Sequence, residues 1–463
     1  MSGTVTLPLW LVVLALILAG IAAMDRILAP SVRWFFRRRM ERVVARLNER
    51  LARPIEPFKL MRRQDMIIRL IYDPQVMQAV VDHAHATKVP ESVAHQQARR
   101  YAREIVPSFS ASMYFGFAIQ AARWLSRLLY RVRLGQFDAK ALAEIDPKAT
   151  MVFVMNHRSN MDYVLVTYLA SERSALSYAV GEWAHVWPLS PLIRSMGAYF
   201  IRRTSRNALY RRVLARYVQM ATAEGVTQAI FPEGGLSLDG KVAAAKLGLL
   251  NYIVAGFQPG LSRDVVFVPV ALNYDRVMED RVLIAAHQEG SRRFRARIPS
   301  ILAFFGKHLW QKLRGRFQRF GYAAVSFGAP VSLSHFLTKT PEAATEALAL
   351  LLMGRIRALV PVLPVPLVAA TLLMSERPLT RAELSDRTGS LLDQLRAVGA
   401  HLHLPRGQEG MAAQQGLDML MLRRLVVTDG DRIAVMPGEE AVLAYYAASI
   451  AQLLEPPSAH WRP

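Results

Sequence analysis

Apolar residues follow different spacings along the chain, and each spacing predicts a different kind of element. Residues 7–24 are almost wholly apolar and uncharged, close to the roughly 20 residues that a helix needs to cross a bilayer. From residue 26 to about 145, apolar positions recur at helical spacing, as in residues 37–51 and 91–105. From about residue 149, short β-branched runs alternate with longer helical patterns. This alternation predicts an α/β fold with a mixed, largely parallel sheet flanked by helices.

The changes in pattern divide the chain into four predicted parts. Residues 1–25 are expected to form a transmembrane signal anchor, and residues 26–145 a helical N-terminal region. Residues 146–335 are expected to form the α/β domain. Residues 336–463 predict a smaller α+β domain similar to a winged helix, in which two helical patterns lead to a hairpin turned by Asp429-Gly430-Asp431.

Charge beside the first apolar run indicates on which side of a membrane the rest of the chain lies. Between Asp25 and Arg53 the sequence has nine arginines against three acidic residues, so the positive-inside rule predicts a cytoplasmic chain after Met24. A cleaved signal peptide would carry positive charge before the apolar run, where none occurs, and a buried core helix would leave the arginines unexplained. We therefore expect a single-pass protein of the inner membrane with its folded domains on the cytoplasmic side.

Composition narrows the classes of function. The 463 residues carry a formal net charge of +22, which indicates a polyanionic partner, either nucleic acid or an anionic membrane surface. Hydrophobic residues make up 52% of the chain, which is ample for a folded core. Cysteine is absent, and its absence excludes disulfides, thiolate zinc sites, iron–sulfur clusters and a cysteine acyl-enzyme within this chain.

One polar segment of the α/β region carries candidate chemistry. Residues 156–163, Asn-His-Arg-Ser-Asn-Met-Asp-Tyr, directly follow a strand pattern, where open α/β sheets bind their ligands. On a straight helix His157 and Asp162 would lie about 140° apart, so they meet only if His157 precedes a helix that carries Asp162 in its first turns. The aspartate would then accept the Nδ1 proton and leave Nε2 as a base. The alternative is an ordinary surface histidine beside a helix cap.

Three further polar segments end predicted strands. Residues 197–203, GAYFIRR, finish on Arg202 and Arg203, whose adjacent guanidiniums suit a phosphate or form a solvated basic turn. Residues 230–235, IFPEGG, end on two glycines that let backbone amides approach a substrate or simply turn the chain. Residues 268–275, VPVALNYD, end the next strand pattern.

Together the four segments resemble the motif blocks of the glycerophosphate acyltransferase superfamily, and within it the sn-glycerol-3-phosphate 1-acyltransferases. The blocks are HRSNMDY, which has the form His-x4-Asp, GAYFIRR, FPEGG and VPVALNYD, and they stand in the family's order over residues 150–275. Residues 325–331, VSFGAPV, are similar to a strand near the end of the family's domain. The resemblance implies transfer of a fatty acyl group from acyl-CoA or acyl-carrier protein to the sn-1 hydroxyl of glycerol 3-phosphate, giving lysophosphatidate.

The resemblance also implies residue roles. His157, oriented by Asp162, would take the proton of the acceptor hydroxyl as its oxygen attacks the thioester in a ternary complex. Glu233 would position the acceptor or brace the loop of the first block, and backbone amides of residues 233–235, Gly234 included, would stabilise the oxyanion. The expected catalytic residues are thus His157, Asp162, Glu233 and Gly234, and the expected substrate-binding residues are Arg158, Ser159, Arg202, Arg203, Gly235, Ser237, Lys241 and Lys246. Ser159 lacks a G-x-S-x-G context and predicts a helix cap rather than a covalent nucleophile.

The sequence departs from the family in its third block. Leu236 and Leu238 stand where the block usually has arginines. The acceptor phosphate would then be bound by the other basic residues of the blocks, or the acceptor would differ. Acylation of lysophosphatidate at its second position, or of another lysolipid, is therefore the alternative reaction.

The sequence and the family resemblance also give expectations about partners and cofactors. We expect no cofactor and no metal, because the remaining histidines lack a familiar ligand spacing. The expected partners are membrane phospholipids, the acyl donor, glycerol 3-phosphate and an acyl-carrier protein. Residues 292–319 have nine Lys or Arg and no acid, which predicts a basic amphipathic helix at a lipid surface or a core-packing helix. A membrane-tethered nucleic-acid-binding protein is the alternative of another class, but residues 378–440 lack the basic cluster that it would need.

Overall fold

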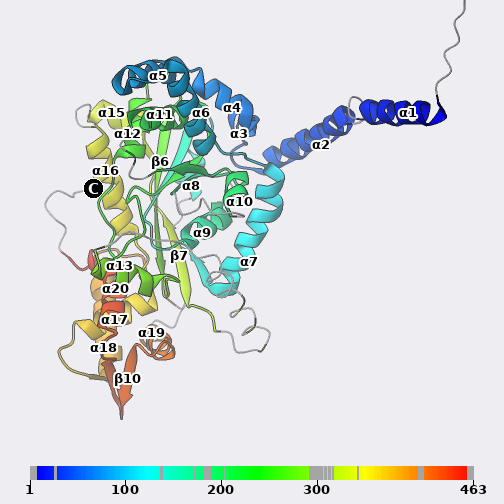
Figure 1. The fold of residues 1–463 in the computed structure, drawn as a ribbon. Coiled ribbons are helices and arrows are strands. Elements are labelled where there is room, and N and C mark those ends of the chain that lie inside the picture. Colours follow the sequence, from blue (N-terminus) through cyan, green and yellow to red (C-terminus); the bar gives the residue numbers. More distant parts are fainter. Residues whose placement is uncertain are drawn as a thin grey trace, which may run out of the picture. The chain divides into compact units, whose positions relative to one another are not determined.

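The structure, a computed structural model, describes residues 8–24, 29–135, 139–170, 174–181, 189–202, 205, 207–290, 306, 310, 314, 318–340, 344–404 and 411–455. The chain divides into two compact units, one of Met1–Ile55 with Glu172–Ser174 and one of Glu56–Ser171 with Ala175–Pro463. The first unit contains the helices α1 (Leu9–Ala23) and α2 (Ala29–Arg50), and the second contains every other element named below (Figure 1). The basic segment 292–319 lies almost wholly outside the described residues.

The first apolar run forms a short helix. α1 has 15 residues, and the side chains of residues 9–20 are exposed. Within the described ranges, no helix combines the length and the apolar character needed to cross a membrane. This finding differs from the transmembrane helix predicted over residues 1–25, because the roughly 20 helical residues that a bilayer requires are not reached.

Helices open the second unit. They are α3 (Pro57–Leu60), α4 (Arg63–Ile71), α5 (Pro74–Thr87), α6 (Glu91–Ile105), the π-helical segment η2 (Ser112–Ala118) and α7 (Ile119–Leu129). α5 shows why such a helix begins where it does: the Asp73 side chain accepts the backbone N–H of Gln75, and Pro74 occupies the first turn. The predicted helical region also contains a strand, β1 (Arg131–Leu134), which joins the main sheet, and the short helix α8 (Ala139–Ala143).

The main sheet has eight strands and is mixed but mostly parallel, as the alternating pattern predicted. Its other strands are β2 (Thr150–Met155), β3 (Ser177–Gly181), β4 (Tyr199–Ile201), β5 (Gln228–Ile230), β6 (Val265–Tyr274), β7 (Tyr322–Phe327) and β8 (Val331–Ser332). The order is β1-β7-β6-β2-β5-β3-β4, with β8 paired to β6. β2 runs parallel to both β5 and β6, whereas β7 is antiparallel to β6. β2 is therefore central, and its carboxyl end lies among other parallel strand ends.

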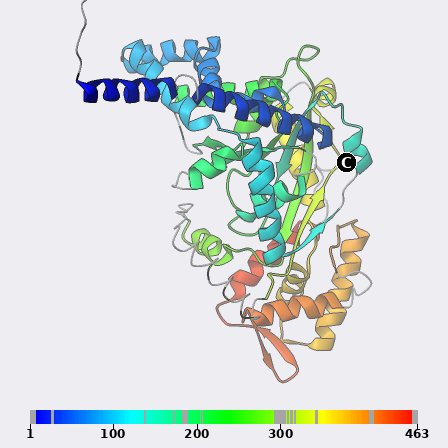
Figure 2. The same cartoon turned by 90° about the vertical axis from the view of Figure 1, so that its right-hand side faces the viewer.

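Helices cover both faces of this sheet (Figures 1 and 2). They are α9 (Met161–Ala170), α10 (Leu189–Ser195), α11 (Ala208–Ala223), α12 (Gly248–Ala255), α13 (Asp280–Gln288), α15 (Leu333–Lys339) and α16 (Ala344–Leu359). Side chains of β2 alternate between two apolar cores: Phe153 and Met155 join the core that includes α9, and Val152 and Val154 join the core that includes α11. Both faces of β2 are thus buried, which fixes its register and the position of the loop that follows it.

The C-terminal elements form a small α+β region. They are α17 (Pro364–Leu373), β9 (Leu379–Thr380), α18 (Arg381–Ala397), α19 (Met411–Leu422), β10 (Val426–Asp429), β11 (Arg432–Val435) and α20 (Glu440–Ala451). The three strands pair in the antiparallel order β10-β11-β9, and β10 and β11 form the hairpin that was predicted around residues 429–431. Val365, Leu417 and Tyr445 belong to the same core cluster as Phe153, so the region shares a hydrophobic core with the α/β domain.

Candidate active site

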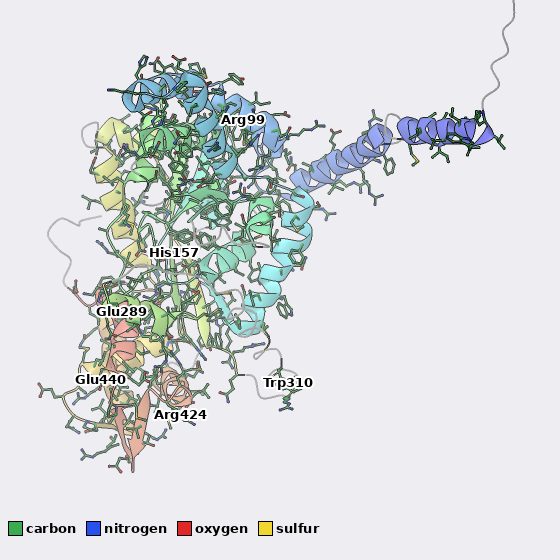
Figure 3. The ribbon with its side chains drawn as sticks, viewed as in Figure 1. Arg99, His157, Glu289, Trp310, Arg424 and Glu440 are labelled. Atoms are coloured by element: carbon green, nitrogen blue, oxygen red, sulfur yellow. The ribbon has the colours of Figure 1, made fainter. Side chains whose placement is uncertain are left out.

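His157 and Asp162 lie side by side just beyond the carboxyl end of β2. His157 is in the loop after the strand and Asp162 is the second residue of α9, so the histidine precedes the helix as the spacing required. The His157 Nδ1 lies 2.9 Å from Asp162 Oδ2, and both side chains are buried. Because the carboxylate accepts the proton on Nδ1, Nε2 carries the lone pair of the neutral ring. Figure 3 shows His157 in the middle of the second unit.

The Asp162 carboxylate organises the loop around it. Its Oδ2 also accepts the backbone N–H groups of Arg158, at 2.7 Å, and Ser159, at 3.0 Å. Its Oδ1 accepts the hydroxyl of Tyr274, the last residue of β6, at 2.6 Å. Four donors therefore hold one carboxylate at the start of α9, where the helix dipole also favours negative charge.

The imidazole ring is held by aromatic neighbours. It stacks on Phe231 with the ring centroids 4.1 Å apart, and it meets Tyr163 edge-on at 5.4 Å. The His157 carbonyl accepts the backbone N–H of Ser237 at 2.8 Å. Ring and backbone are thus both fixed before any substrate binds.

Glu233 contacts the backbone of the histidine and not its ring. Its Oε1 accepts the His157 backbone N–H at 2.9 Å, and its Oε2 accepts that of Ala243 at 3.1 Å. Burial raises the pKa of Glu233 to about 7, although these hydrogen bonds and the nearby Arg158 act in the opposite direction. Of the two roles expected for Glu233, the geometry matches bracing of the loop.

In the glycine turn after Glu233, the backbone N–H of Gly234 is hydrogen-bonded within the protein. Gly234 has a φ of +67°, in the left-handed region that favours glycine, and an added Cβ would lie 2.8 Å from Cδ of Lys246. Its backbone N–H donates to the Phe231 carbonyl at 3.0 Å. This N–H closes a turn, and the expected role of Gly234 in stabilising the oxyanion stays a prediction. Gly235 follows and is buried.

Arg158 and Ser159 were expected to bind substrate, but their side chains contact other groups of the protein. The Arg158 side chain is buried, donates to the Gly240 carbonyl and lies over the ring of Tyr445, 4.7 Å from its centroid. The Ser159 hydroxyl donates to Glu279 at 2.8 Å and accepts the N–H of Met161 at 3.1 Å, so it caps α9. Arginine is rarely this buried, and no spacing in the sequence indicates these contacts.

The other expected binding residues are spread around this centre. Arg202 ends the edge strand β4, and its guanidinium forms a bidentate pair with Glu104 at 2.8 and 2.6 Å. Arg203 lies outside the described residues. The Ser237 hydroxyl donates to the Lys241 carbonyl at 2.8 Å and supports the loop. The side chains of Lys241 and Lys246 are exposed. The structure therefore brings the third block to His157, but not Arg202.

Two contributors to the site were not expected from the sequence. Tyr274 belongs to the fourth block, yet only the fold shows that its hydroxyl reaches Asp162. Glu279, just before α13, accepts the Asn160 side-chain amide at 3.0 Å in addition to the Ser159 hydroxyl, and burial raises its pKa. No local sequence signal marks Glu279, because its partners lie 120 and 119 residues earlier in the chain.

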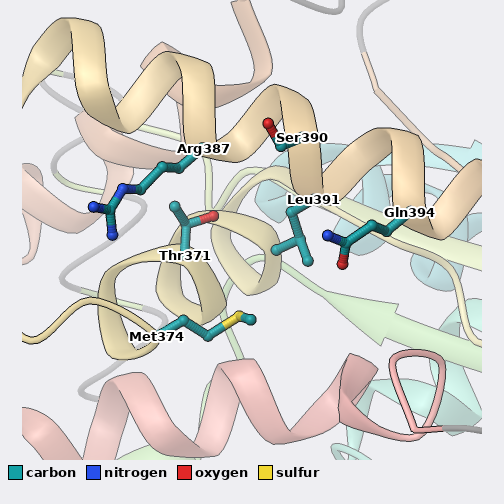
Figure 4. A pocket seen from close by; sticks show the side chains of 6 residues that line it. All are labelled: Thr371, Met374, Arg387, Ser390, Leu391 and Gln394. Carbon is teal, nitrogen blue, oxygen red and sulfur yellow. The ribbon is translucent and has the colours of Figure 1, made fainter.

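A cavity in the described part of the chain lies outside the four motif blocks. Among the described residues, no group of three or more histidine, aspartate or glutamate side chains could hold a metal ion. The cavity has a volume of about 300 Å³ and lies between α17 and α18 (Figure 4). Its lining residues, none of which belongs to the four motif blocks, are Thr371, Met374, Arg387, Ser390, Leu391 and Gln394.

Comparison with known proteins gives two family matches. The acyltransferase family model matches residues 137–273, and the model of the glycerol-3-phosphate acyltransferase C-terminal region matches residues 308–460. A relative named glycerol-3-phosphate acyltransferase from Shewanella loihica is 29% identical over 86% of this chain and 51% of its own length. Another of the same name from Aeromonas hydrophila is 30% identical over 86% and 51%. The chain thus spans about half the length of the curated relatives it matches.

One solved structure is also similar, that of the 1-acyl-sn-glycerophosphate acyltransferase from Thermotoga maritima. The sequence identity is 20%, and the TM-score is 0.31 over 53% of this chain and 78% of that one.

The fold and the first family match define a protein with an acyltransferase domain, within which His157 and Asp162 lie. The second match and the curated relatives are more specific: residues 308–460 match the C-terminal region of glycerol-3-phosphate acyltransferases, and the curated relatives carry that name. The resemblance of the four motif blocks is therefore confirmed.

Proposed function

We propose that this protein transfers a fatty acyl group from acyl-CoA or acyl-carrier protein to the sn-1 hydroxyl of glycerol 3-phosphate. One observation carries the proposal: the imidazole of His157 is bound through Nδ1 to a buried aspartate at the end of a central strand. This is the arrangement that orients a general base. The two family matches and the names of the curated relatives support the choice of reaction.

The proposed chemistry is a direct transfer. Nε2 of His157 takes the proton of the acceptor hydroxyl as its oxygen attacks the thioester carbonyl. The tetrahedral intermediate collapses, the C–S bond breaks, and the thiolate leaving group takes the proton back from the imidazolium. Asp162 keeps the ring turned and stabilises the positive charge while it lasts. No covalent acyl-enzyme forms in this scheme.

The acceptor phosphate needs cationic partners, and Lys241 and Lys246 are proposed for this role. Both side chains are exposed on the segment that follows the Glu233 turn, and Lys246 lies against Gly234. We expect Lys246→Met to raise the KM for glycerol 3-phosphate more than kcat falls, because a phosphate contact is made equally in the ground and transition states. Lys339→Met, an exposed lysine on α15, is the matched control.

The direct test of the reaction is acyl transfer from a labelled donor to glycerol 3-phosphate by the full chain. His157→Ala and Asp162→Ala should each lower kcat by about 100-fold or more, the usual effect of losing a general base. His287→Ala removes an exposed histidine on α13 and should leave kcat unchanged. Equal activity of all four proteins would refute the mechanism.

A different acceptor is the second candidate. Leu236 and Leu238, at family arginine positions, pack against the apolar core, so neither supplies charge to a phosphate. The same assay with lysophosphatidate in place of glycerol 3-phosphate distinguishes the two reactions. A higher kcat/KM for lysophosphatidate would assign the chain to the second acylation.

We also propose that the protein works at a membrane surface. α1 exposes apolar side chains, and α7 exposes Trp124 beside Arg127 with no acidic residue between Val106 and Phe137. Aromatic and basic side chains together favour anionic lipid headgroups. Sedimentation with anionic but not neutral vesicles would support this location, and no sedimentation with either would contradict it.

Nucleic acid is not the partner that we propose for the C-terminal region. α19 stands where a winged helix places its recognition helix, and its exposed polar residues are Gln414 and Asp418. Neither provides the positive charge that contacts phosphates. Salt-sensitive retention of the full chain on DNA, lost on substitution of Arg423 or Arg424, would contradict this proposal.

A further inference from the structure

The loop that separates the two residues of the pair is contacted by the C-terminal helix α20. Within this loop, the buried guanidinium of Arg158 lies over the Tyr445 ring and donates to the Gly240 carbonyl. Gly240 itself lies against α20: an added Cβ would stand 1.9 Å from the Tyr445 carbonyl oxygen. Helix α20 therefore packs closely on Arg158 and on Gly240, the residue whose carbonyl accepts a hydrogen bond from Arg158.

The face of the Tyr445 ring, and not its hydroxyl, makes this contact. The hydroxyl is buried and has no hydrogen-bond partner among the residues that the structure describes. The Arg158 Nε and Nη2 likewise make no hydrogen bond within that part of the chain. The ring face and the Gly240 carbonyl are thus the contacts that fix this arginine.

The neighbouring tyrosine reaches the same loop by a second route. The Tyr446 hydroxyl accepts the backbone N–H of Val277 at 3.0 Å and donates to Asp280, which also pairs with Arg423. Between Val277 and Asp280 lies Glu279, whose carboxylate accepts the Ser159 hydroxyl and the Asn160 amide. Adjacent tyrosines of one helix therefore restrain residues 158–160 from two sides.

We infer that Tyr445 is a positioning residue for the His157–Asp162 pair, and that the C-terminal region is a working part of the active site. Asp162 Oδ2 accepts the backbone N–H groups of Arg158 and Ser159, so any shift of residues 158–159 moves the donors that orient this carboxylate. The effect on acyl transfer rests on the proposed function. The effect on the His157–Asp162 hydrogen bond does not.

The test replaces the aromatic ring of Tyr445 while helix α20 stays in place. We expect Tyr445→Leu to lower kcat by about 10- to 100-fold, because small displacements of catalytic groups have effects of this size. The KM for glycerol 3-phosphate should change by less than about threefold, since no substrate contact is removed. Tyr445→Phe keeps the ring face and should restore kcat. Arg158→Lys keeps the charge but loses the flat group over the ring, and should resemble Tyr445→Leu.

A matched control separates positioning from general loss of packing. Ile450→Ala also empties a buried position of α20, but in the core cluster that includes Leu367 and Leu395. It should lower Tm while keeping the kcat of the folded enzyme. Equal kcat losses in Tyr445→Leu and Ile450→Ala, or a normal kcat in Tyr445→Leu, would overturn the inference. If Tyr445→Leu does not fold, the kcat of Arg158→Lys against wild type decides.

A readout without turnover distinguishes this inference from the proposed reaction. In protein labelled with 15N-histidine, the proton shared by His157 Nδ1 and Asp162 should give a downfield NMR signal, assigned by its loss in His157→Gln. Tyr445→Leu and Arg158→Lys should weaken or shift this signal, and Tyr445→Phe and Ile450→Ala should not. An unchanged signal in Tyr445→Leu would refute the positioning role even if the wild-type protein acylates a different acceptor.

Discussion

The Glu233 carboxylate accepts the backbone N–H of His157 at 2.9 Å, so an acidic residue of the third motif block holds the main chain of the catalytic candidate rather than its ring. The second oxygen of the same carboxylate accepts the N–H of Ala243. The side chain thus joins the loop after β2 to the loop after β5. A residue so placed affects catalysis through the position of His157.

Glu233→Gln tests this role with almost no change in volume. The glutamine oxygen can still accept the His157 N–H, but its NH2 group would then face the N–H of Ala243, donor against donor. We expect kcat to fall by about tenfold, the cost of one unsatisfied buried donor. The KM values for both substrates should stay close to wild type. A large rise in the KM for glycerol 3-phosphate with normal kcat would show instead that Glu233 binds the acceptor.

The stability of the protein should depend on pH through the same carboxyl group. Burial raises the pKa of Glu233 from 4.5 to about 7, so between these values the folded chain keeps a proton that the unfolded chain has lost. The free energy of unfolding therefore falls as pH rises through this range, by about 3 kcal/mol for this group. Thermal melts of Glu233→Gln should show a smaller fall in Tm from pH 4.5 to pH 7.

The fall of Tm with pH will not vanish in Glu233→Gln, because a second buried carboxyl group also has a raised pKa. Burial raises the pKa of Asp275 to about 7, against hydrogen bonds from the backbone N–H groups of Tyr322 and Val365. A Tm of Glu233→Gln that falls as steeply as that of the wild type would contradict the raised pKa of Glu233.

The hydroxyl of Tyr274 should matter for catalysis, because it donates to Asp162 at 2.6 Å. Tyr274→Phe leaves that carboxylate oxygen without this donor, and a hydrogen bond to a charged group contributes about 1.5–3 kcal/mol. We expect kcat to fall by about tenfold or more with KM unchanged. Tyr199→Phe is the control, since its buried hydroxyl has no hydrogen-bond partner in the described ranges. Equal kcat values in the two variants would contradict a role for Tyr274.

Some of this site could be predicted from the sequence, and the physical reason is local. His157 and Asp162 are five residues apart, and a strand end followed by a helix start is the local arrangement that brings such a pair together. The buried strand before them was visible as an apolar run. By contrast, β1 has the four residues Arg-Val-Arg-Leu, too few for a period to stand out, and its pairing with β7 depends on residues 191 positions later.

The positions of the Arg158 and Arg202 side chains depend on tertiary contacts. Arg158 was expected to bind substrate because it belongs to the first motif block, yet its side chain contacts Tyr445 and Gly240 in the interior. Arg202 looked like a ligand because it ends a strand, yet Glu104 of α6 holds it. The partners lie 82 residues or more away in the chain, and no spacing rule reports them.

Ser159→Ala distinguishes direct transfer from a covalent mechanism. The Ser159 hydroxyl donates to Glu279 and caps α9, so its loss should lower stability by about 1 kcal/mol. We expect kcat to fall by less than about tenfold, whereas loss of a nucleophile lowers it by about 1,000-fold or more. Mass spectrometry after mixing the wild type with acyl-CoA alone should find no acylated protein. An acyl adduct on Ser159 would replace the proposed mechanism with an acyl-enzyme.

Replacing Leu236 of the third block with the arginine that is usual in the family should lower the stability of the protein. Leu236 is partly buried and packs against the apolar core, where a guanidinium would be separated from water without an arranged partner. Leu236→Arg should therefore lower stability by about 1–3 kcal/mol, measured as a lower Tm, and should not lower the KM for glycerol 3-phosphate. Leu236→Met keeps the apolar contact and should change neither quantity. A lower KM at unchanged Tm in Leu236→Arg would mean that the acceptor phosphate binds at this position after all, and that Lys241 and Lys246 are not its principal ligands.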